Sequence, residues 1–381
     1  MISQNKMEAV REPVTAVVVA CQADQDYLPR TLQGLYAQDL KPQRIFIAVP
    51  AQTAELTELV HSIFPTTSEA LTSETASRNY QVRVPAVEIV ETGVVNSLAA
   101  ALQKIPALAE ENTGQRGWIW ILHADSAPDK SALNILLRKG ELSQAIGAVG
   151  PKQLTWIENN SAEKTKTTTP QLLEVGIRAT RSARRVPEVD LGERDQGQHD
   201  NREDMLAIGT AGMLVRSDIY RQLGGLNNDL GPFGDGLEFS RRIRLAGYRV
   251  VVAPAAVVYH RQFSFYPDSP AGVESSISND AMAQSYGQRR QAQIFNSLLA
   301  APDAVLVFCW LGYILGGIAR MLIRLAGRDL VRARGEIAAA AHIATSFSAV
   351  RRGRKQIAAA GSAVAGLRAL EARPVEIRWA K

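Results

Sequence analysis

Cysteine is scarce in this chain of 381 residues: Cys21 and Cys309 are the only two, and they lie far apart in the sequence. Such a pair excludes a disulfide framework and a cysteine-rich zinc cluster, and it is typical of a reducing compartment. The first eight residues, MISQNKME, also lack the basic segment followed by an apolar one that marks a signal peptide. We therefore expect the N-terminal part of the chain to stay in the cytosol.

Glycine-rich phosphate-binding motifs are missing as well. The apolar run at residues 14–21 is followed by Q-A-D-Q-D at 22–26 rather than by a G-x-G-x-x-G turn, and no P-loop sequence occurs. These absences exclude the usual dinucleotide and P-loop modes of binding a diphosphate. If the chain binds a nucleotide, a divalent cation held by carboxylates is the physical alternative.

Acidic residues are few in the last quarter of the chain, although the net charge of the whole is only +5. The cations that gather there are Arg320, Arg324, Arg328, Arg332, Arg334, Arg351, Arg352, Arg354 and Lys355. Interleaved aromatic residues and nucleic-acid motifs are lacking in this region, so we expect no nucleic acid as a partner. Unbalanced positive charge favours a membrane surface instead.

A regular alternation of predicted strands and helices fills the first part of the sequence. Apolar runs predict strands in the segment that begins at Trp118 and at residues 14–21, 44–50, 87–91 and 146–150. Helical spacing of apolar residues predicts helices at 28–38, 54–64, 97–105 and 130–142. This order predicts an α/β fold with a mostly parallel sheet and helices on both faces, the layout of a nucleotide-binding domain.

One predicted strand ends in an isolated carboxylate. The run W-I-W-I-L-H-A-D-S-A-P at 118–128 stops abruptly at Asp125, two residues after His123. Because ligands of open α/β sheets bind just past the carboxyl ends of strands, Asp125 is a candidate contact for a metal or a phosphate. Turn chemistry alone also favours Asp, Ser and Pro after a strand, so both interpretations stay open at this point.

A long polar segment interrupts the pattern at residues 158–202. It is too long for a tight connection, and we expect it to pass over the active face. There it would offer Arg178, Arg181, Arg184 and Arg185 to an anionic ligand, while a solvated loop is the alternative. A further strand is predicted at residues 206–215.

A second group of polar residues follows. Asp235 is predicted to cap a helix that ends at Gly247, and Glu238 lies one turn further on, so both carboxylates face the same edge. Strands predicted at 249–253 and 257–260 place His260 at their end. Capping explains such acidic pairs in many proteins, and a lone histidine is more often structural than a ligand. Their joint occurrence at the ends of elements nevertheless indicates a site.

Over residues 13–262 the order of these motifs resembles the family 2 glycosyltransferases, which have the GT-A fold. The segments that carry the resemblance are V-T-A-V-V-V-A-C at 14–21 with L-P-R-T-L at 28–32, W-I-L-H-A-D-S-A-P at 120–128, G-T-A-G-M-L-V-R at 209–216 with L-G-G-L at 223–226, and D-G-L-E-F-S-R-R-I-R-L-A-G at 235–247 with Y-H at 259–260. The resemblance implies an inverting transfer of a sugar from a nucleotide-diphosphate donor, with Mg²⁺ or Mn²⁺ bridging the diphosphate.

The resemblance also implies a metal site and a general base. Asp125 matches the metal-side carboxylate of the family's D-x-D pair, whose first acid is replaced here by His123, and His260 matches a later histidine that contacts the metal or the phosphate. The family's base belongs to an E-D pair, where this chain reads Asp235 and then glycine. Either Asp235 or Glu238 would take that role, and Asp235 is preferred because a residue at the start of a helix can face the cleft.

Further positions would border the nucleotide sugar. These are Cys21, Asp24, Asn96, His123, Asp125 and Gly212. The acid that usually reads the nucleobase after the second strand is absent from A-V-P-A at 48–51, so backbone groups or Asp24 would have to replace it. A catalytically degenerate binding or scaffold subunit therefore stays open as a second class of function. A nucleotidyltransferase is a third, disfavoured by the helix at Asp235 and by His260.

The rest of the chain points to a membrane. Residues 304–319 are uncharged, and the run extends to a candidate transmembrane helix at about 304–325 if Arg320 and Arg324 snorkel; an interfacial helix is the alternative. Amphipathic helices are expected at 335–370. We thus divide the chain into an N-terminal tail at 1–12, a GT-A domain at 13–290 and a hydrophobic, basic helical region at 291–381. The expected location is the cell membrane, with a cytoplasmic catalytic domain that acts on a polysaccharide or lipid-linked acceptor in cell-wall biogenesis.

Overall fold

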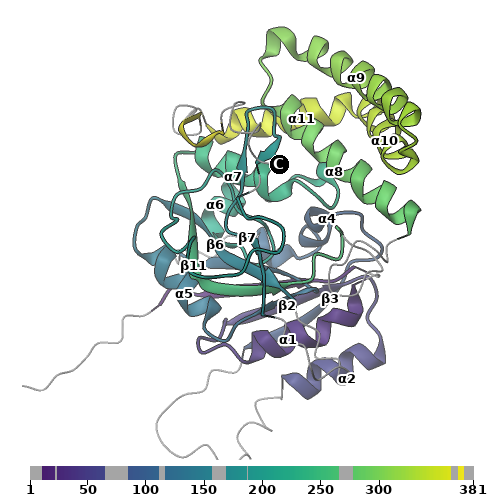
Figure 1. Ribbon diagram of the computed structural model, residues 1–381. Coiled ribbons are helices and arrows are strands. Elements are labelled where there is room, and N and C mark those ends of the chain that lie inside the picture. Colours follow the sequence, from purple (N-terminus) through teal and green to yellow (C-terminus); the bar gives the residue numbers. More distant parts are fainter. Residues whose placement is uncertain are drawn as a thin grey trace, which may run out of the picture.

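A computed structural model describes residues 11–21, 24–64, 85–110, 116–156, 169–186, 188–265, 278–361 and 368–372. Within these ranges nine strands form one sheet in the order β3-β2-β1-β4-β10-β6-β11-β5, with β7 paired to β6 (Figure 1). The strands are β1 Val14–Val19, β2 Arg44–Val49, β3 Ala86–Glu91, β4 Trp118–His123, β5 Ser126–Pro128, β6 Ile146–Thr155, β7 Leu172–Glu174, β10 Leu214–Arg216 and β11 Arg249–His260. Residues 1–10, on which the predicted tail and the signal-peptide prediction depend, lie outside the described residues.

The sheet is mixed rather than mostly parallel. Strands β3, β2, β1 and β4 pair in parallel, as do β6 and β11. Strand β10 runs antiparallel to both β4 and β6, and β5 runs antiparallel to β11. Strands β1, β2 and β4 carry the apolar runs that the sequence predicts, because both of their faces are buried, whereas β3 is only partly buried.

The two faces of the sheet bury separate apolar cores. On β4, Ile119 and Ile121 contact one core, while Trp118, Trp120 and Leu122 contact the other. Helices α1 (Leu28–Tyr36) and α5 (Ala132–Glu141) supply leucines to the Trp120 side; α4 (Leu98–Leu102), α6 (Ser217–Gln222) and α7 (Asp235–Leu245) cover the Ile121 side. The predicted α/β fold with helices on both faces is therefore confirmed. The described helix α2 (Ala54–Ile63) lies beside α1 (Figure 1).

The prediction of a strand at residues 206–215 is mostly wrong. Only Leu214–Arg216 pairs in the sheet, as β10. Before it, the Gly209 N–H donates to the Glu174 side chain, and Gly212 has a φ of +91°, which a ladder residue does not adopt. The segment therefore leaves the sheet and runs along the edge where the strands end.

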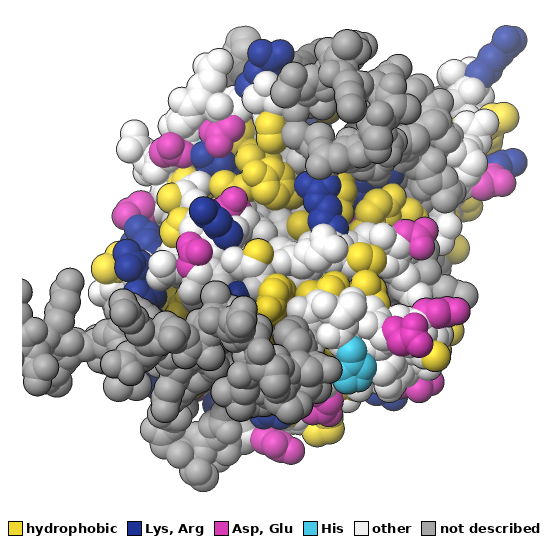
Figure 2. Space-filling model, turned by 90° about the horizontal axis from the view of Figure 1, so that it is seen from below, with side chains coloured by type: hydrophobic (Ala, Val, Ile, Leu, Met, Phe, Trp, Pro, Cys, Tyr) yellow, Lys and Arg dark blue, Asp and Glu magenta, His cyan; other side chains and the backbone are white. Residues whose placement is uncertain are grey.

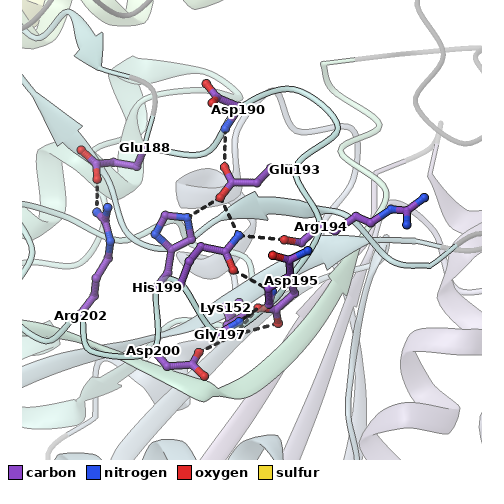
Figure 3. A network of polar contacts seen from close by, with 12 residues as sticks. Lys152, Glu188, Asp190, Glu193, Arg194, Asp195, Gly197, His199, Asp200 and Arg202 are labelled. Carbon is purple, nitrogen blue, oxygen red and sulfur yellow. Dashed lines mark hydrogen bonds and ion pairs between the residues drawn. The ribbon is translucent and has the colours of Figure 1, made fainter.

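The polar segment after β6 folds back over the sheet. Strand β7 pairs with β6, and the short strands β8 (Arg178–Ala179) and β9 (Arg185–Val186) form a hairpin. Lys152 on β6 is almost fully buried and bonds Asp195 at 2.8 Å and Asp200 at 2.7 Å (Figure 3). These contacts attach the segment to the sheet, so within its described residues it is more ordered than a solvated loop.

Helices form the end of the described chain. They are α8 Asn279–Leu299, α9 Leu306–Ala326, α10 Leu330–Thr345 and α11 Phe347–Ala360, and Figure 1 shows them together above the α/β body. Helix α8 crosses the domain boundary predicted at residue 290, and that division stays a prediction. Helices were predicted at residues 335–370, and α10 and α11 occupy this range up to Ala360. Residues 362–367 lie outside the described residues.

Candidate functional site

Sheet topology brings Asp125 and His260 together. Strand β4 ends at His123, the chain turns at Asp125, and β5 then runs antiparallel along the end of β11. In that pairing Ser126 lies opposite His260. A residue just before β5 and the last residue of β11 are thus neighbours, although they are far apart in the sequence.

Three side chains that could serve as metal ligands meet at this point. One ligand atom each from His123, Asp125 and His260 lies within 4.8 Å of the others. His260 Nε2 is 3.4 Å from Asp125 Oδ1, and the two imidazole rings are nearly perpendicular, with centroids 5.7 Å apart. Two imidazole nitrogens and a carboxylate oxygen are ligands that transition metals accept.

A glutamine sets the tautomer of His260. Gln153 donates its amide Nε2 to the Ala211 carbonyl at 3.1 Å, which leaves Oε1 to accept from His260 Nδ1 at 2.9 Å. Nδ1 is therefore the donor to Gln153, and Nε2 is the ring nitrogen that faces Asp125. Orientation of a ligating histidine through its other nitrogen is a common feature of metal sites.

The protonation states also suit a cation. Burial by itself would raise the pKa of Asp125, but the neighbouring His260 and His123 and the Phe263 N–H, which donates to Oδ2 at 2.8 Å, lower it well below its usual range. Burial and repulsion from His260 lower the pKa of His123 to about 4. At neutral pH the site thus offers a carboxylate and a neutral imidazole, and the Thr210 hydroxyl lies 3.1 Å from His123 Nε2.

Seven of the predicted site residues line one hollow of about 140 Å³. They are Cys21, Asp24, Asn96, His123, Asp125, Asp235 and His260. A second hollow of about 170 Å³ adjoins it and shares His123, Asp235 and His260. Phe233 and Phe265 pack edge to face, with centroids 4.8 Å apart, and line both.

Two carboxyl groups in this hollow are readily protonated. Burial raises the pKa of Asp235 to about 6. Burial and the charge of Asp125 raise the pKa of Asp24 to about 7, although its Oδ1 accepts from the Cys21 N–H at 2.6 Å. Carboxyl groups whose pKa values are raised by burial are typical of active sites.

Asp235 does not cap its helix as predicted. The N-cap of α7 is Gly234, at φ +84°, and Asp235 is the first helical residue, with Oδ1 accepting from the Gly236 N–H at 2.8 Å. A cap at Gly234 needs no side chain, and Asp235 is thereby left to line the hollow.

Glu238 is held in an ion pair, although it lies near enough to Asp235 for its charge to contribute to the raised pKa of that carboxyl. Its two carboxylate oxygens each accept from Arg242 at 2.7 Å, and Arg242 also donates to the Leu223 and Gly225 carbonyls. Both side chains are almost fully buried. Glu238 is thus held by an ion pair with the residue four positions further along the helix.

This ion pair predicts an effect on stability. We expect Glu238→Ala to lower the free energy of unfolding by about 3–5 kcal/mol, because it leaves the Arg242 charge buried and unpaired. Urea denaturation followed by tryptophan fluorescence measures this, and Glu238→Leu/Arg242→Met, which removes both charges, should regain most of the loss. A stable Glu238→Ala protein without turnover would instead assign Glu238 a catalytic role.

Gly212 lies beside the sheet rather than in either hollow. A Cβ there would come within 2.7 Å of Pro151 and 2.9 Å of Val258, and its carbonyl accepts from the Trp120 indole at 3.2 Å. Close packing and a positive φ therefore explain why position 212 is a glycine. Contact of Gly212 with a nucleotide sugar stays a prediction.

Sequence reasoning missed several residues around the site. Gln153 and Thr210 hold the two histidines, and Glu174, which accepts from Gly209, pairs with Arg185 at 2.9 Å. A polar residue within the β6 run was the available signal for Gln153. Of the four arginines expected near a ligand, Arg185 lines the second hollow, whereas Arg178 pairs with Glu188 at 2.6 Å.

Comparison with known proteins identifies the family. The model of "Glycosyltransferase like family 2" matches residues 13–276, and no curated protein matches the chain. One similar solved structure is GalNAc-T7 with UDP, GalNAc and Mn²⁺, at 13% sequence identity and a TM-score of 0.46 over 76% of this chain. Another is the mannosyltransferase PcManGT from Pyrobaculum calidifontis with GDP-Man and Mn²⁺, at 15% identity and a TM-score of 0.41, covering 91% of this chain and 88% of that one. A third is S. aureus TarS 1-349, at 12% identity and a TM-score of 0.39, covering 88% of this chain and 91% of that one. The chain spans 48% of the GalNAc-T7 chain. The family model covers more than half of the chain and confirms the predicted family: this chain belongs to the family 2 glycosyltransferases.

Proposed function

We propose that this protein is an inverting glycosyltransferase that uses a divalent metal ion and moves a sugar from a nucleotide-diphosphate donor to a polysaccharide or lipid-linked acceptor. The observation that carries the proposal is the hollow in which Asp24, His123, Asp125, Asp235 and His260 meet. It lies where the strands β1 and β4 end side by side, since Val19 is the register partner of His123. Ligands of open α/β sheets bind at such an edge.

The donor set supports Mn²⁺ more than Mg²⁺. His123, Asp125 and His260 would hold the ion, and two of these three offer nitrogen, which Mn²⁺ accepts more readily than the oxygen-seeking Mg²⁺. When bound, the ion would offset the negative charge that builds up on a departing diphosphate. In the protein itself, the Gln153 bond and the buried Asp125 keep the ligand atoms oriented before any donor binds.

Asp235 is the proposed general base. It lines both hollows, and its carboxyl, with a pKa raised to about 6, is ionised at neutral pH yet basic enough to take a proton from an acceptor hydroxyl. Inversion follows if that hydroxyl attacks the sugar carbon directly while Asp235 removes its proton. Glu238 is bound by Arg242 and lines neither of these two hollows.

Gln153 provides a test of the metal site that does not depend on turnover. We expect Gln153→Ala to weaken Mn²⁺ binding about 10- to 100-fold, because His260 loses the acceptor that fixes its tautomer. Calorimetric titration with Mn²⁺ alone measures the affinity. Gln153→Glu keeps an acceptor oxygen for Nδ1, so its Mn²⁺ affinity should fall less. Equal Mn²⁺ affinity of the unaltered chain and both variants would remove His260 from the ligand set.

A membrane location is supported by helix α9. It is the one described helix long and apolar enough to cross a bilayer, at Asp303–Ala326 with α9 as its main part. Phe308, Leu315 and Leu322 are 74%, 65% and 57% exposed and lie on one stripe. The other side packs on α10, where Trp310 Nε1 donates to the Ile343 carbonyl at 2.8 Å and Arg320 pairs with the buried Glu336 at 3.0 Å. A helix held along one side by polar contacts fits the membrane surface better than a span.

This stripe predicts vesicle binding. We expect Leu315→Asp/Leu322→Asp to weaken flotation of the full chain with phospholipid vesicles by at least about tenfold, because two exposed apolar side chains are replaced by charges. Leu142→Asp/Leu191→Asp is the control, since these leucines are even more exposed but lie outside the C-terminal helices. An unchanged double variant of α9 would exclude the stripe as the membrane contact.

Turnover with purified protein separates the proposed enzyme from the scaffold alternative. Release of nucleoside diphosphate from a panel of nucleotide sugars in Mn²⁺, with and without lipid-linked acceptors, should detect hydrolysis or transfer. No turnover with any donor, despite binding of the donor, would favour the degenerate subunit.

A further inference from the structure

A further cavity, distinct from the two hollows of the proposed active site, lies on the other side of α7. It has a volume of about 540 Å³ and is formed by α7, the end of α8, the start of α9 and α11. Asn296 on α8 lines both this cavity and the second hollow of the active site. A volume of this size is in the range of small-molecule sites.

The lining is strongly cationic. Its basic side chains are Arg181, Arg241, Arg351, Arg354, Lys355 and Arg368, against the carboxylates of Glu238, Asp303 and Glu371. Glu238 is neutralised by Arg242 and Asp303 by Arg354. In the described part of the chain the side chains of Arg351 and Lys355, which project from neighbouring turns of α11, have no acidic partner.

A buried arginine strengthens the case for an anionic ligand. Arg241 is only 4% exposed, and its Nε has no hydrogen-bond partner within the described residues. Its other nitrogens donate to the Thr180 carbonyl at 3.0 Å and the Asn296 carbonyl at 3.4 Å, and Glu371 lies 3.7 Å away. An unsatisfied buried guanidinium N–H is costly unless something binds it.

The cavity also has an apolar wall. Leu245, Leu299, Leu306 and Ile357 line it, and Leu306 is the first residue of α9, whose exposed apolar stripe is the proposed membrane contact. By contrast, the opposite end of the molecule shows lysines and arginines interspersed with acidic side chains over its described atoms (Figure 2). Cations beside an apolar wall at the membrane-facing end suit an amphiphile with an anionic head.

We propose that this cavity binds the phosphate-bearing headgroup of a lipid, with the cations around the phosphate and the first carbons of the chains against Leu306 and Ile357. The inference rests on the proposed membrane association, but it concerns a site separate from the sugar-transfer hollow. It would hold the protein at a bilayer in a fixed orientation. Arginine and lysine together supply both the directed bonds and the charge that a phosphate needs.

Calorimetric titration of the full chain with monomeric dihexanoyl phosphatidic acid tests the proposal without any membrane. We expect one site per chain, and binding of dihexanoyl phosphatidylcholine and of inorganic phosphate weaker by about tenfold or more. Arg351→Glu/Lys355→Glu should lower the affinity for phosphatidic acid at least about tenfold. Ala358→Glu, which adds a carboxylate to the exposed lining, should do the same.

The control carries the same change in charge elsewhere. Lys104→Glu/Arg138→Glu alters two exposed cations on the α/β body and should leave the affinity unchanged. Equal binding by Arg351→Glu/Lys355→Glu and by this control would overturn the proposal, as would absence of binding to the unaltered chain. Inorganic phosphate that binds as tightly as phosphatidic acid would show an anion site without a lipid. Donor hydrolysis, measured on the same variants, should be unchanged, which keeps a failure here distinct from a failure of the proposed enzyme.

Discussion

Replacing Asp125 with alanine is expected to lower donor turnover by about 100- to 1000-fold in Mn²⁺. This corresponds to the loss of about 3–4 kcal/mol of charge stabilisation, which is typical when a buried electrostatic contact to the reacting group is removed. Asp125 is the carboxylate of the histidine–aspartate–histidine cluster and is 4% exposed. Release of nucleoside diphosphate at saturating donor, with Mn²⁺ varied, measures the effect.

The control must separate metal binding from local structure, because Asp125 Oδ2 also accepts from the Phe263 N–H. Asp125→Asn keeps an acceptor oxygen for that N–H but loses the charge. We expect it to retain the melting temperature of the unaltered chain while Mn²⁺ affinity and turnover fall. Full turnover by Asp125→Ala would remove Asp125 from the metal site.

Replacing Asp235 with asparagine is expected to lower kcat by about 100- to 10,000-fold, the range for loss of a general base. The side chain lines the hollow beside His123 and His260, and asparagine keeps its size and its bond to the Gly236 N–H. Mn²⁺ and donor affinities should change little. A variant with unchanged kcat would exclude Asp235 as the base.

The pH profile gives the same assignment a second, independent test. Burial raises the pKa of Asp235 to about 6, and a base acts in its ionised form, so kcat/KM should rise with pH up to about 6 and level off above it. In Asp235→Asn this rise should vanish. Asp24, with a pKa raised to about 7, titrates nearby, and Asp24→Asn is the control: loss of the rise in that variant alone would assign it to Asp24.

How much of this site could be predicted from the sequence depends on how local each signal is. Asp125 and His260 were found because each follows an apolar run at the end of a strand, and parallel strands end at one edge. Gln153 escaped because its role depends on the amide orientation set by Ala211, a residue far along the chain. The ion pair of Glu238 with Arg242 has the spacing of a helical pair, but burial, which the sequence does not show, decides its meaning.

The fold shows the same limit. The core strands β1, β2 and β4 were predicted because their apolar runs are continuous. The antiparallel insertion of β10 was not, because only three of its residues pair and two glycines precede them. For α9, composition favoured a span; its packing on α10 and the buried Glu336 is a tertiary feature that hydropathy does not report.

A crystal structure of the full chain soaked with Mn²⁺ and a nucleoside diphosphate, with data collected at the manganese absorption edge, is the sharpest test of the proposed site. We expect one anomalous peak within ligand distance of Asp125 and His260, with His123 facing it and the diphosphate in the hollow beside Asp235. Manganese bound elsewhere, or a diphosphate bound at full occupancy without an ion near Asp125, would show that this hollow is not the metal-dependent donor site.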